Sequence, residues 1–233
     1  MLTDPPSDPE KTEKPSVQDP LVVTDRVRLR RAHQRGAFDR KTIYSILDAM
    51  PLCHVGYQMK DAPVVTPTFQ WREGDYIYWH GSSASRGLKA AQGHQVCLTV
   101  TLLDGFVMAR SALHHSANYR SVMLFGEATL VEDPDEKSKK LRAFVESLFP
   151  GRSDLLRPNT DQEEKATSIL GMPIDEGSAK IRTGGPNDDE EDYALPIWAG
   201  VIPISMTVGE PEDDPRNLPG VTPPEHTRSL KLG

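Results

Sequence analysis

The segment from His80 to Lys89, His-Gly-Ser-Ser-Ala-Ser-Arg-Gly-Leu-Lys, combines hydroxyl, glycine and cationic residues in a way that suits an anion. It follows an apolar, aromatic run, so we expect a strand to end here and a helix to begin near residues 83–85. A helix start presents free backbone N–H groups, and Arg86 and Lys89 add positive charge one turn apart. The segment therefore predicts a phosphate site, although serines before a helix are also ordinary N-caps.

Short strands rich in Val, Thr and aromatic residues surround this segment. They are predicted at residues 52–58, 63–71, 76–80, 95–103, 106–111, 121–131, 179–182 and 196–204. Helices, each following a capping residue and carrying apolar residues at helical spacing, are predicted at residues 39–50, 133–150 and 160–170. Because many short strands follow one another closely, a mostly antiparallel barrel is favoured over a parallel sheet. The predicted fold class is α+β, mainly β.

The bulk composition indicates one soluble domain. Within the 233 residues, the stretches 1–20 and 209–233 are rich in proline and charged residues, so we expect one domain at 21–208 between two mobile tails. The net charge of −7 does not suggest a nucleic acid or an anionic membrane as a partner. No apolar stretch reaches the ~20 residues that span a bilayer and no signal peptide is recognisable, so a cytoplasmic location is expected.

The remaining residues of chemical interest have simpler explanations. Cys53 and Cys97 lie in apolar runs outside any metal or redox motif, which indicates buried thiols. His114 and His115 are adjacent, so on a strand they would point to opposite faces and would not share a metal ion. The acidic run at 188–192 matches no calcium loop. No metal site is predicted, and Trp198 is interpreted as a core or subunit-interface residue.

Several segments, in order along the chain, resemble the pyridoxamine 5′-phosphate oxidase superfamily. They are the strand end at 78–82 followed by Ser85-Arg86, then His114-His115-Ser116, the stretch from Arg120-Ser121 to Gly126, and the ending at 196–203 around Trp198. The similarity is strongest to the flavin-nucleotide-binding branch that includes the nitroimidazole-reductase-like proteins. It covers roughly residues 25–205.

The resemblance implies an antiparallel, Greek-key-like split β-barrel with peripheral helices, assembled as a homodimer with FMN in clefts between the subunits. Carried over by position, the flavin-binding residues are Val65, Thr66, Thr68, His80, Gly81, Ser82, Ser85, Arg86, Lys89, Arg120 and Ser121. Ser85 and Arg86 would bind the phosphate. One departure is Gly87, which stands where the oxidases carry a lysine, so phosphate contact is expected to shift to Lys89. The oxidases' C-terminal substrate segment has no counterpart either, which argues against vitamin B6 oxidation.

The leading functional hypothesis is an FMN-dependent oxidoreductase that takes a hydride from NADH or NADPH and reduces a small substrate, for which a nitroaromatic is one candidate. An alternative is a flavin-binding or carrier protein without turnover. Another is a split barrel that binds haem or a deazaflavin instead. No catalytic residue is assigned: His80 is interpreted as a proton donor, a wall over the flavin, or a histidine hydrogen-bonded at a strand end.

Overall fold

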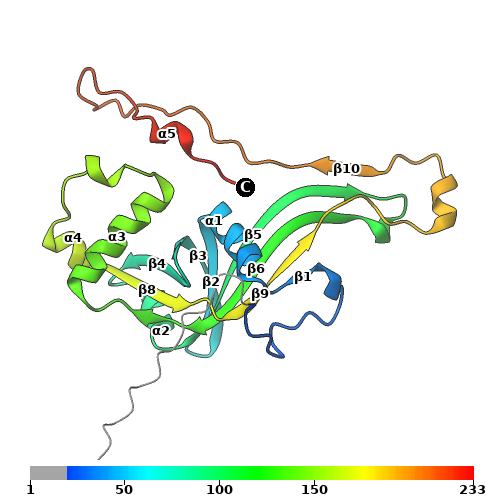
Figure 1. Ribbon diagram of the computed structural model, residues 1–233, viewed down its shortest axis with the longest axis horizontal. Coiled ribbons are helices and arrows are strands. Elements are labelled where there is room, and N and C mark those ends of the chain that lie inside the picture. The colour runs from blue at the N-terminus through cyan, green and yellow to red at the C-terminus, as the bar shows by residue number, and fades with distance from the viewer. Residues whose placement is uncertain (1–19) are drawn as a thin grey trace, which may run out of the picture.

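The computed structural model describes residues 20–233, so the tail predicted at 1–20 lies almost entirely outside the described part. Its strands join in one sheet with the order β1-β9-β6-β5-β2-β3-β4-β8-β7, and β10 pairs with β5 off this path. The pairings between these strands are all antiparallel. The sheet curls into an open barrel with helices around it (Figure 1). The predicted α+β split barrel is confirmed.

The strands are β1 (Gly36–Ala37), β2 (Leu52–Met59), β3 (Ala62–Glu73), β4 (Tyr76–Ser82), β5 (Gln95–Met108), β6 (Ser116–Glu127), β7 (Thr129–Leu130), β8 (Thr167–Pro173), β9 (Glu176–Arg182) and β10 (Gly200–Pro203). The α-helices are α1 (Arg40–Ala49), α2 (Arg86–Ala91), α3 (Pro134–Leu148), α4 (Asp161–Ala166) and α5 (His226–Ser229). Short 3₁₀ turns lie at His33–Arg35, Ala112–His114, Ser153–Leu155 and Glu190–Ala194.

Strand β5 carries much of the core and explains one difference from the sequence prediction. The two strands expected at 95–103 and 106–111 are one long strand, whose register against β6 shifts between Leu103 and Gly105. Before the shift, the even-numbered residues Leu98 and Val100 are buried, and after it the odd-numbered Val107 is buried. A bulge adds one residue and so exchanges the two faces of a strand. The break in alternation therefore looked like the end of a strand.

Strand β8 corrects the helix predicted at 160–170. The capping box of Thr160 and Glu163 is present, but the helix α4 ends at Ala166 and the chain continues as a strand along β4. Ile169 and Leu170 are fully buried there. This segment is apolar on both faces because the barrel covers one face and α3 approaches the other, and such a run does not distinguish a buried strand from a helix.

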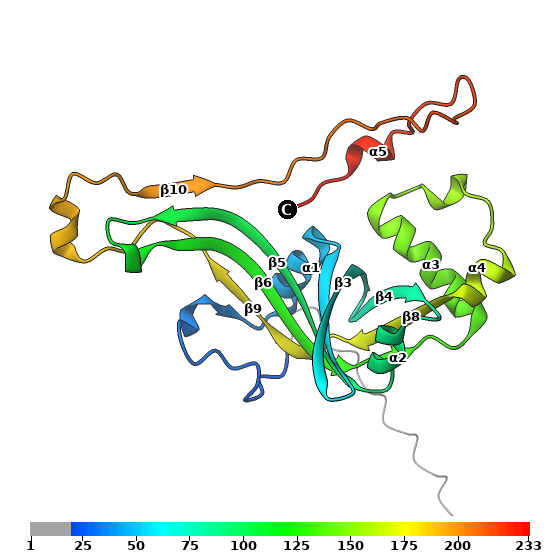
Figure 2. The same cartoon turned by 180° about the vertical axis from the view of Figure 1, so that it is seen from behind.

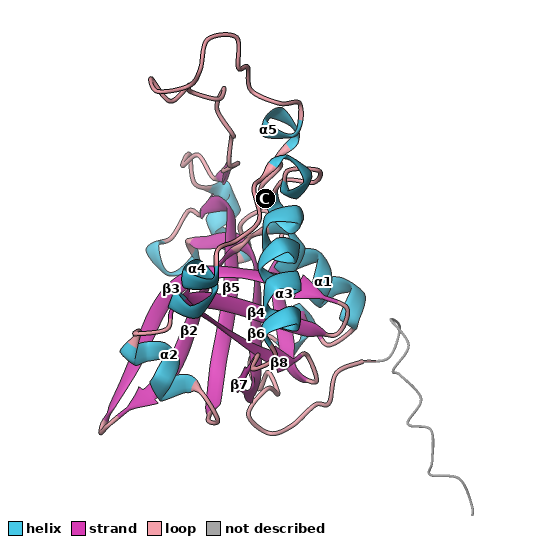
Figure 3. Ribbon diagram, turned by 90° about the vertical axis from the view of Figure 1, so that its left-hand side faces the viewer, coloured by secondary structure: helices cyan, strands magenta, loops and turns pink. Residues whose placement is uncertain are grey.

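In the view of Figure 3, α1 and α3 are drawn on one side of the strands and α2 on the other, whereas Figure 1 shows α1 near β5 and β6 and α3 apart from it. The side chain of Asp39 caps α1 by accepting a hydrogen bond from the Thr42 N–H at 2.8 Å. Ile43, Ile46 and Leu47 of α1 are at most 1% exposed and pack into the barrel core. Helix α3 has the expected cap at Asp133, but no residue of it is fully buried. Its apolar face is therefore only partly used by the core.

Strands β5, β6 and β10 extend beyond the barrel as an arm (Figures 1 and 2). Gly105 of β5 permits the close approach of β10, since a Cβ atom there would lie 2.9 Å from the Ile202 carbonyl oxygen. Trp198, just before β10, is 67% exposed, so the interpretation of this residue as part of the chain's own core is wrong. The expected tail 209–233 runs back to the barrel, where the Gly233 N–H donates to the Ala49 carbonyl at 3.0 Å.

The two cysteines and the lengths of the helices were the subject of predictions from composition. Cys53 is fully buried, as predicted, whereas Cys97 is only partly buried; both are free thiols. Burial raises the pKa of Cys53 to about 12, which keeps this thiol protonated at neutral pH. Within residues 20–233, no helix is both long enough and apolar enough to cross a bilayer.

Candidate functional site

A cleft of about 290 Å³ opens between β2, β3, β4 and α2, beside the segment His80–Lys89. It is lined by Val55, Tyr57, Thr66, Pro67, Thr68, Trp79, His80, Gly81, Ser85, Gly87, Leu88 and Ala91. Val55 and Trp79 belong to the barrel core, so the floor of the cleft is rigid and apolar. Hydroxyl groups of Thr66, Thr68 and Ser85 are placed around that floor. An apolar floor with a few polar groups is typical of a small-molecule site.

The cleft brings together some of the residues expected from the sequence and leaves others outside. Thr66, Thr68, His80, Gly81 and Ser85 line it. The remaining members of the same segments do not line it: Val65, Ser82, Arg86 and Lys89 are all exposed. Val65 points away from the cleft because neighbouring residues of a strand face opposite sides, and it is 65% exposed.

Ser85 serves as the N-cap of α2, because its Oγ accepts a hydrogen bond from the Leu88 N–H at 3.3 Å. The ordinary capping role is therefore real, and the hydroxyl proton stays free to donate to a ligand. Arg86 and Lys89 follow on a helix of only six residues, and neither forms an ion pair with any residue in 20–233. Two unpaired cations therefore stand beside the mouth of the cleft.

Gly87 faces the cleft and explains the departure from the lysine that the oxidases carry. A Cβ atom at this position would collide with the hydroxyl of Tyr57. That hydroxyl is held by a 2.9 Å hydrogen bond to Thr66 Oγ1. Glycine at 87 therefore leaves room for the Tyr57 side chain beside the start of α2, where both residues line the cleft.

We predict that Gly87→Ala weakens ligand binding without unfolding the protein. Alanine favours the helix by up to ~1 kcal/mol, but it displaces Tyr57 and breaks the bond to Thr66, which is worth about 0.5–1.5 kcal/mol. The expected loss of flavin affinity is about 2- to 12-fold, measured by fluorescence titration of the apoprotein. Adding Tyr57→Phe removes the colliding hydroxyl from the alanine variant. If Gly87→Ala binds flavin as tightly as the parent, Tyr57 does not shape the site.

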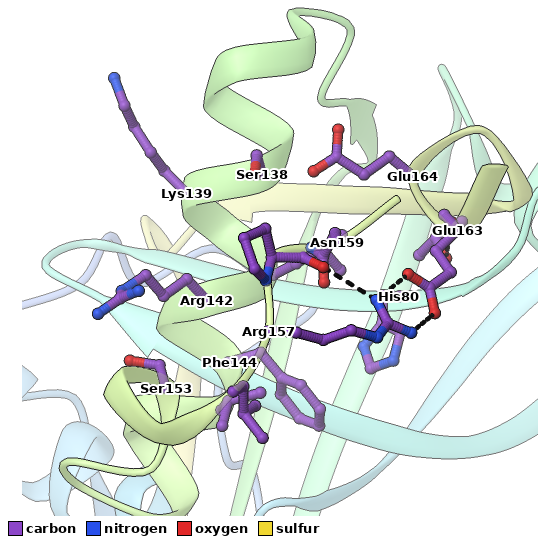
Figure 4. Close-up of a pocket in the computed structure, with 15 residues that line it drawn as sticks. His80, Ser138, Lys139, Arg142, Phe144, Ser153, Arg157, Asn159, Glu163 and Glu164 are labelled. Atoms are coloured by element: carbon purple, nitrogen blue, oxygen red, sulfur yellow. Dashed lines mark hydrogen bonds and ion pairs between the residues drawn. The ribbon is translucent and has the colours of Figure 1, made fainter. Parts of the chain in front are cut away.

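A second cavity, of about 590 Å³, lies between α3, β4 and the loop that leads to α4. Leu141, Phe144 and Val145 of α3 form its apolar wall, and His80 is part of its floor (Figure 4). His80 thus lines both this cavity and the cleft beside α2. The two cavities meet at one residue of β4.

The imidazole of His80 lies among aromatic rings. Its centroid is 4.6 Å from that of Phe144 and 6.0 Å from that of Trp71. The Nδ1 atom is buried and has no hydrogen-bond partner among the described residues. Burial lowers the pKa of His80, so the ring is neutral at physiological pH and keeps a lone pair for a ligand.

The rim of the second cavity is rich in charge. Arg157 forms a bidentate pair with Glu163, with one contact of 2.8 Å, and this pair lowers the pKa of Glu163 to about 2. Arg142 pairs with Asp154. Lys139 is exposed and forms no ion pair with a described residue. Cations in the lining and apolar side chains at the wall suit a partly apolar ligand that carries anionic groups.

Arg120 and Ser121, which were expected near the ligand, lie away from the cleft of their own chain. Arg120 on β6 forms a bidentate pair with Asp104 at 2.7 and 3.0 Å and lines a different cavity, near Met50 and the C-terminal end. The Ser121 hydroxyl donates to the Lys180 carbonyl at 3.3 Å. Contact between these residues and a ligand in a cleft would require a second copy of the chain.

A group of possible metal ligands lies on the arm. Atoms of His114, Asp188 and Asp192 lie within 4.8 Å of one another. The Asp188 carboxylate is fully buried, and it already accepts hydrogen bonds from the Arg110 guanidinium at 2.9 Å and from the Arg110 backbone N–H at 3.0 Å. A cation would have to compete with this guanidinium for the same oxygens.

Sequence reasoning missed Tyr57, Trp79 and the whole second cavity. Tyr57 could have been found from the alternation of β2, which places it on the face of Val55. The apolar residues of α3 were recognised as one helix face, but such a pattern does not reveal whether the core or a ligand covers it.

A family model described as pyridoxamine 5′-phosphate oxidase matches residues 39–181. The flavocytochrome Anf3 from Azotobacter vinelandii is 53% identical, covering 90% of this chain and 98% of its own, with a TM-score of 0.87. An FAD- and haem-binding protein from Mycobacterium smegmatis is 35% identical, covering 85% of this chain and 98% of its own, with a TM-score of 0.81.

A third structure, from Bacteroides thetaiotaomicron, is described as a 5-nitroimidazole antibiotic resistance protein. It is 22% identical, covering 63% of this chain and 86% of its own, with a TM-score of 0.52, so the likeness is one of fold. No curated protein matched the sequence.

Proposed function

This chain belongs to the pyridoxamine 5′-phosphate oxidase family. We propose that it is an oxidoreductase that binds both a flavin and a haem. The observation that carries the proposal is the pair of cavities that meet at His80. One cavity has hydroxyls in its lining and the cations Arg86 and Lys89 nearby, which suits a nucleotide. The other is larger and combines an apolar wall on α3 with charged side chains. The relatives that are 53% and 35% identical over most of the chain are a flavocytochrome and an FAD- and haem-binding protein.

The cleft beside α2 is the proposed flavin site. Thr66 and Thr68 of β3 would contact the polar edge of the isoalloxazine ring, and the apolar floor at Val55 and Trp79 would exclude water. The phosphate would lie at Ser85 and Arg86, where a hydroxyl donor and an unpaired guanidinium are available. FMN, expected from the sequence, and FAD, bound by the mycobacterial relative, share this ribityl phosphate. The mass of the extracted flavin distinguishes them.

We also propose that two copies of the chain associate around the flavin sites. Exposed apolar side chains on the outside of the barrel and on the arm support this, among them Val65 at 65%, Phe69 at 50% and Trp198 at 67%. Large apolar surfaces of this kind are commonly covered by a partner. A second copy would also bring Arg120 and Ser121 toward the cleft of its neighbour.

NADH or NADPH is the proposed electron donor, and a small molecule, for which nitroaromatics are one candidate class, is the proposed acceptor. When bound, the flavin supplies hydride chemistry and the haem supplies one-electron chemistry. The chain would orient both groups and exclude water from them.

We predict that excess NADH or NADPH, added without air to the purified holoprotein, bleaches the visible absorption of the flavin. A flavin that stays oxidised with either nucleotide, and is reduced only by dithionite, would favour the carrier alternative over an enzyme. Dithionite is the matched control here because it shows that the bound flavin is able to accept electrons.

A further inference from the structure

The apolar face of α3 is only partly covered by the rest of the chain. Leu141, Phe144 and Val145 lie on this face, yet no residue of α3 is fully buried. Phe144 and Leu141 contact the small cluster of Trp71, Tyr78 and Ile169 on one side, and on the other they border the cavity of about 590 Å³. Since exposed apolar surface is costly, a helix with this arrangement is suited to a ligand that completes its packing.

His80 is the histidine in the lining of this cavity, and its side chain is partly buried. Its Nδ1 atom is without a hydrogen-bond partner among the described residues, and the ring packs between Phe144 and Trp71. The enclosed Nδ1 atom is not open to the cavity, whereas Nε2 is not enclosed and forms no hydrogen bond with a described residue. Nε2 is therefore the nitrogen that a ligand in the cavity can reach. A neutral imidazole is also a common protein ligand of haem iron.

Other histidines in the described chain do not combine these features. His226 has a buried, unpartnered Nε2 atom, but it does not line either of the cavities that meet at β4. His94 is exposed, and its ring bonds to the Gln92 carbonyl at 2.8 Å. His114 lies on the arm beside Asp188, away from α3.

The rim fits the other end of such a ligand. Lys139, Arg142 and Arg157 line the cavity. In Figure 4 the charged ends of Lys139 and Arg142 point away from His80, and the Arg157 guanidinium lies in front of it. Lys139 is unpaired within the described residues, and the partners of Arg142 and Arg157 are exposed carboxylates that other anions can replace. The propionates of a haem are anions of this type, and its macrocycle is flat and apolar.

We propose that the cavity between α3, β4 and the loop before α4 is the haem site, and that His80 is an axial ligand of the haem iron. This rests on the proposed function, namely that the chain binds a haem at all. The porphyrin lies against Leu141, Phe144 and Val145, and the propionates lie toward the cationic rim. Because His80 also lines the flavin cleft, the two groups occupy neighbouring sites separated by β4.

The test titrates haemin into apoprotein and follows the Soret band, with flavin content measured separately. His80→Ala should lose haem affinity by more than about 100-fold, since even changes in residues behind a metal ligand cost about 10- to 100-fold. Because His80 also lines the flavin cleft, the flavin content of this variant is compared directly with that of the parent. His94→Ala, the matched control, should bind haemin like the parent. When imidazole is added to His80→Gly, the free imidazole should take the place of the missing side chain and restore the Soret band of the parent.

The outcomes separate the two proposals. If the parent protein takes up no haemin, the proposed haem function fails, whatever His80 does. If the parent binds haemin and His80→Ala binds it with the same affinity and spectrum, the assignment of His80 is overturned. Should His80→Ala fail to fold, Leu141→Arg is the second variant: it fills the cavity from α3, and it must abolish haemin binding while flavin binding persists. Unchanged haemin binding in Leu141→Arg would refute the location.

Discussion

Arg86→Ala is expected to weaken flavin binding by about 10- to 150-fold. Arg86 is exposed beside the cleft and forms no ion pair with a described residue, so its guanidinium is available to a phosphate without breaking a contact. A hydrogen bond to a charged group contributes about 1.5–3 kcal/mol, and each 1.4 kcal/mol is about a tenfold change in affinity. The dissociation constant of the apoprotein for FMN and for FAD, from quenching of flavin fluorescence, measures the effect.

Riboflavin provides the sharpest control for this prediction. It lacks the phosphate, so its affinity should be nearly the same in the parent and in Arg86→Ala. Lys41→Ala removes an exposed cation from α1, far from the cleft, and should leave the FMN affinity unchanged. Equal affinity for FMN in Arg86→Ala and the parent would mean that the phosphate does not lie at the start of α2.

Trp79→Ala is expected to destabilise the apoprotein by about 3–5 kcal/mol, the usual cost of removing a large buried aromatic side chain. Trp79 is 2% exposed and belongs to the main core cluster, while its neighbour His80 faces the opposite side of β4 toward α3. Since domains are stable by only about 5–15 kcal/mol, this loss would remove much of the total. Urea unfolding followed by circular dichroism gives the value.

The same substitution at Trp198 is the matched comparison. This side chain is 67% exposed, and substitutions at exposed sites usually change stability by less than about 0.5 kcal/mol. A larger loss that grows with protein concentration would indicate that Trp198 is buried by a second copy. A Trp79→Ala protein as stable as the parent would contradict the placement of Trp79 in the core.

The fold was predictable where local chemistry and tertiary packing agree. The caps at Asp39, Asp133 and Thr160 begin helices as expected, because a side chain that accepts from the N3 backbone N–H works in any context. The end of α4 was not predictable in the same way. Ile169 and Leu170 fit a helical face, but pairing with β4 buries them completely as a strand, and only the partner strand decides between the two.

The candidate site was predictable to the extent that one continuous segment forms it. The stretch from His80 to Ser85 runs from β4 into α2, so the expected strand-to-helix junction holds the cleft. Residues brought by other strands, such as Tyr57, were missed because their contacts depend on the register of β2 against β3. The second cavity depends on the tertiary position of α3, which periodicity does not give. Arg120 was assigned by resemblance alone, and in its own chain it pairs with Asp104.

The absorption spectrum of the purified protein, combined with the masses of its extracted ligands, tests the central claim most directly. The account predicts a Soret band together with flavin absorption, a haem mass, and a mass of FMN or FAD in comparable amounts. A protein that is purified colourless and takes up neither flavin nor haemin when both are added would contradict it.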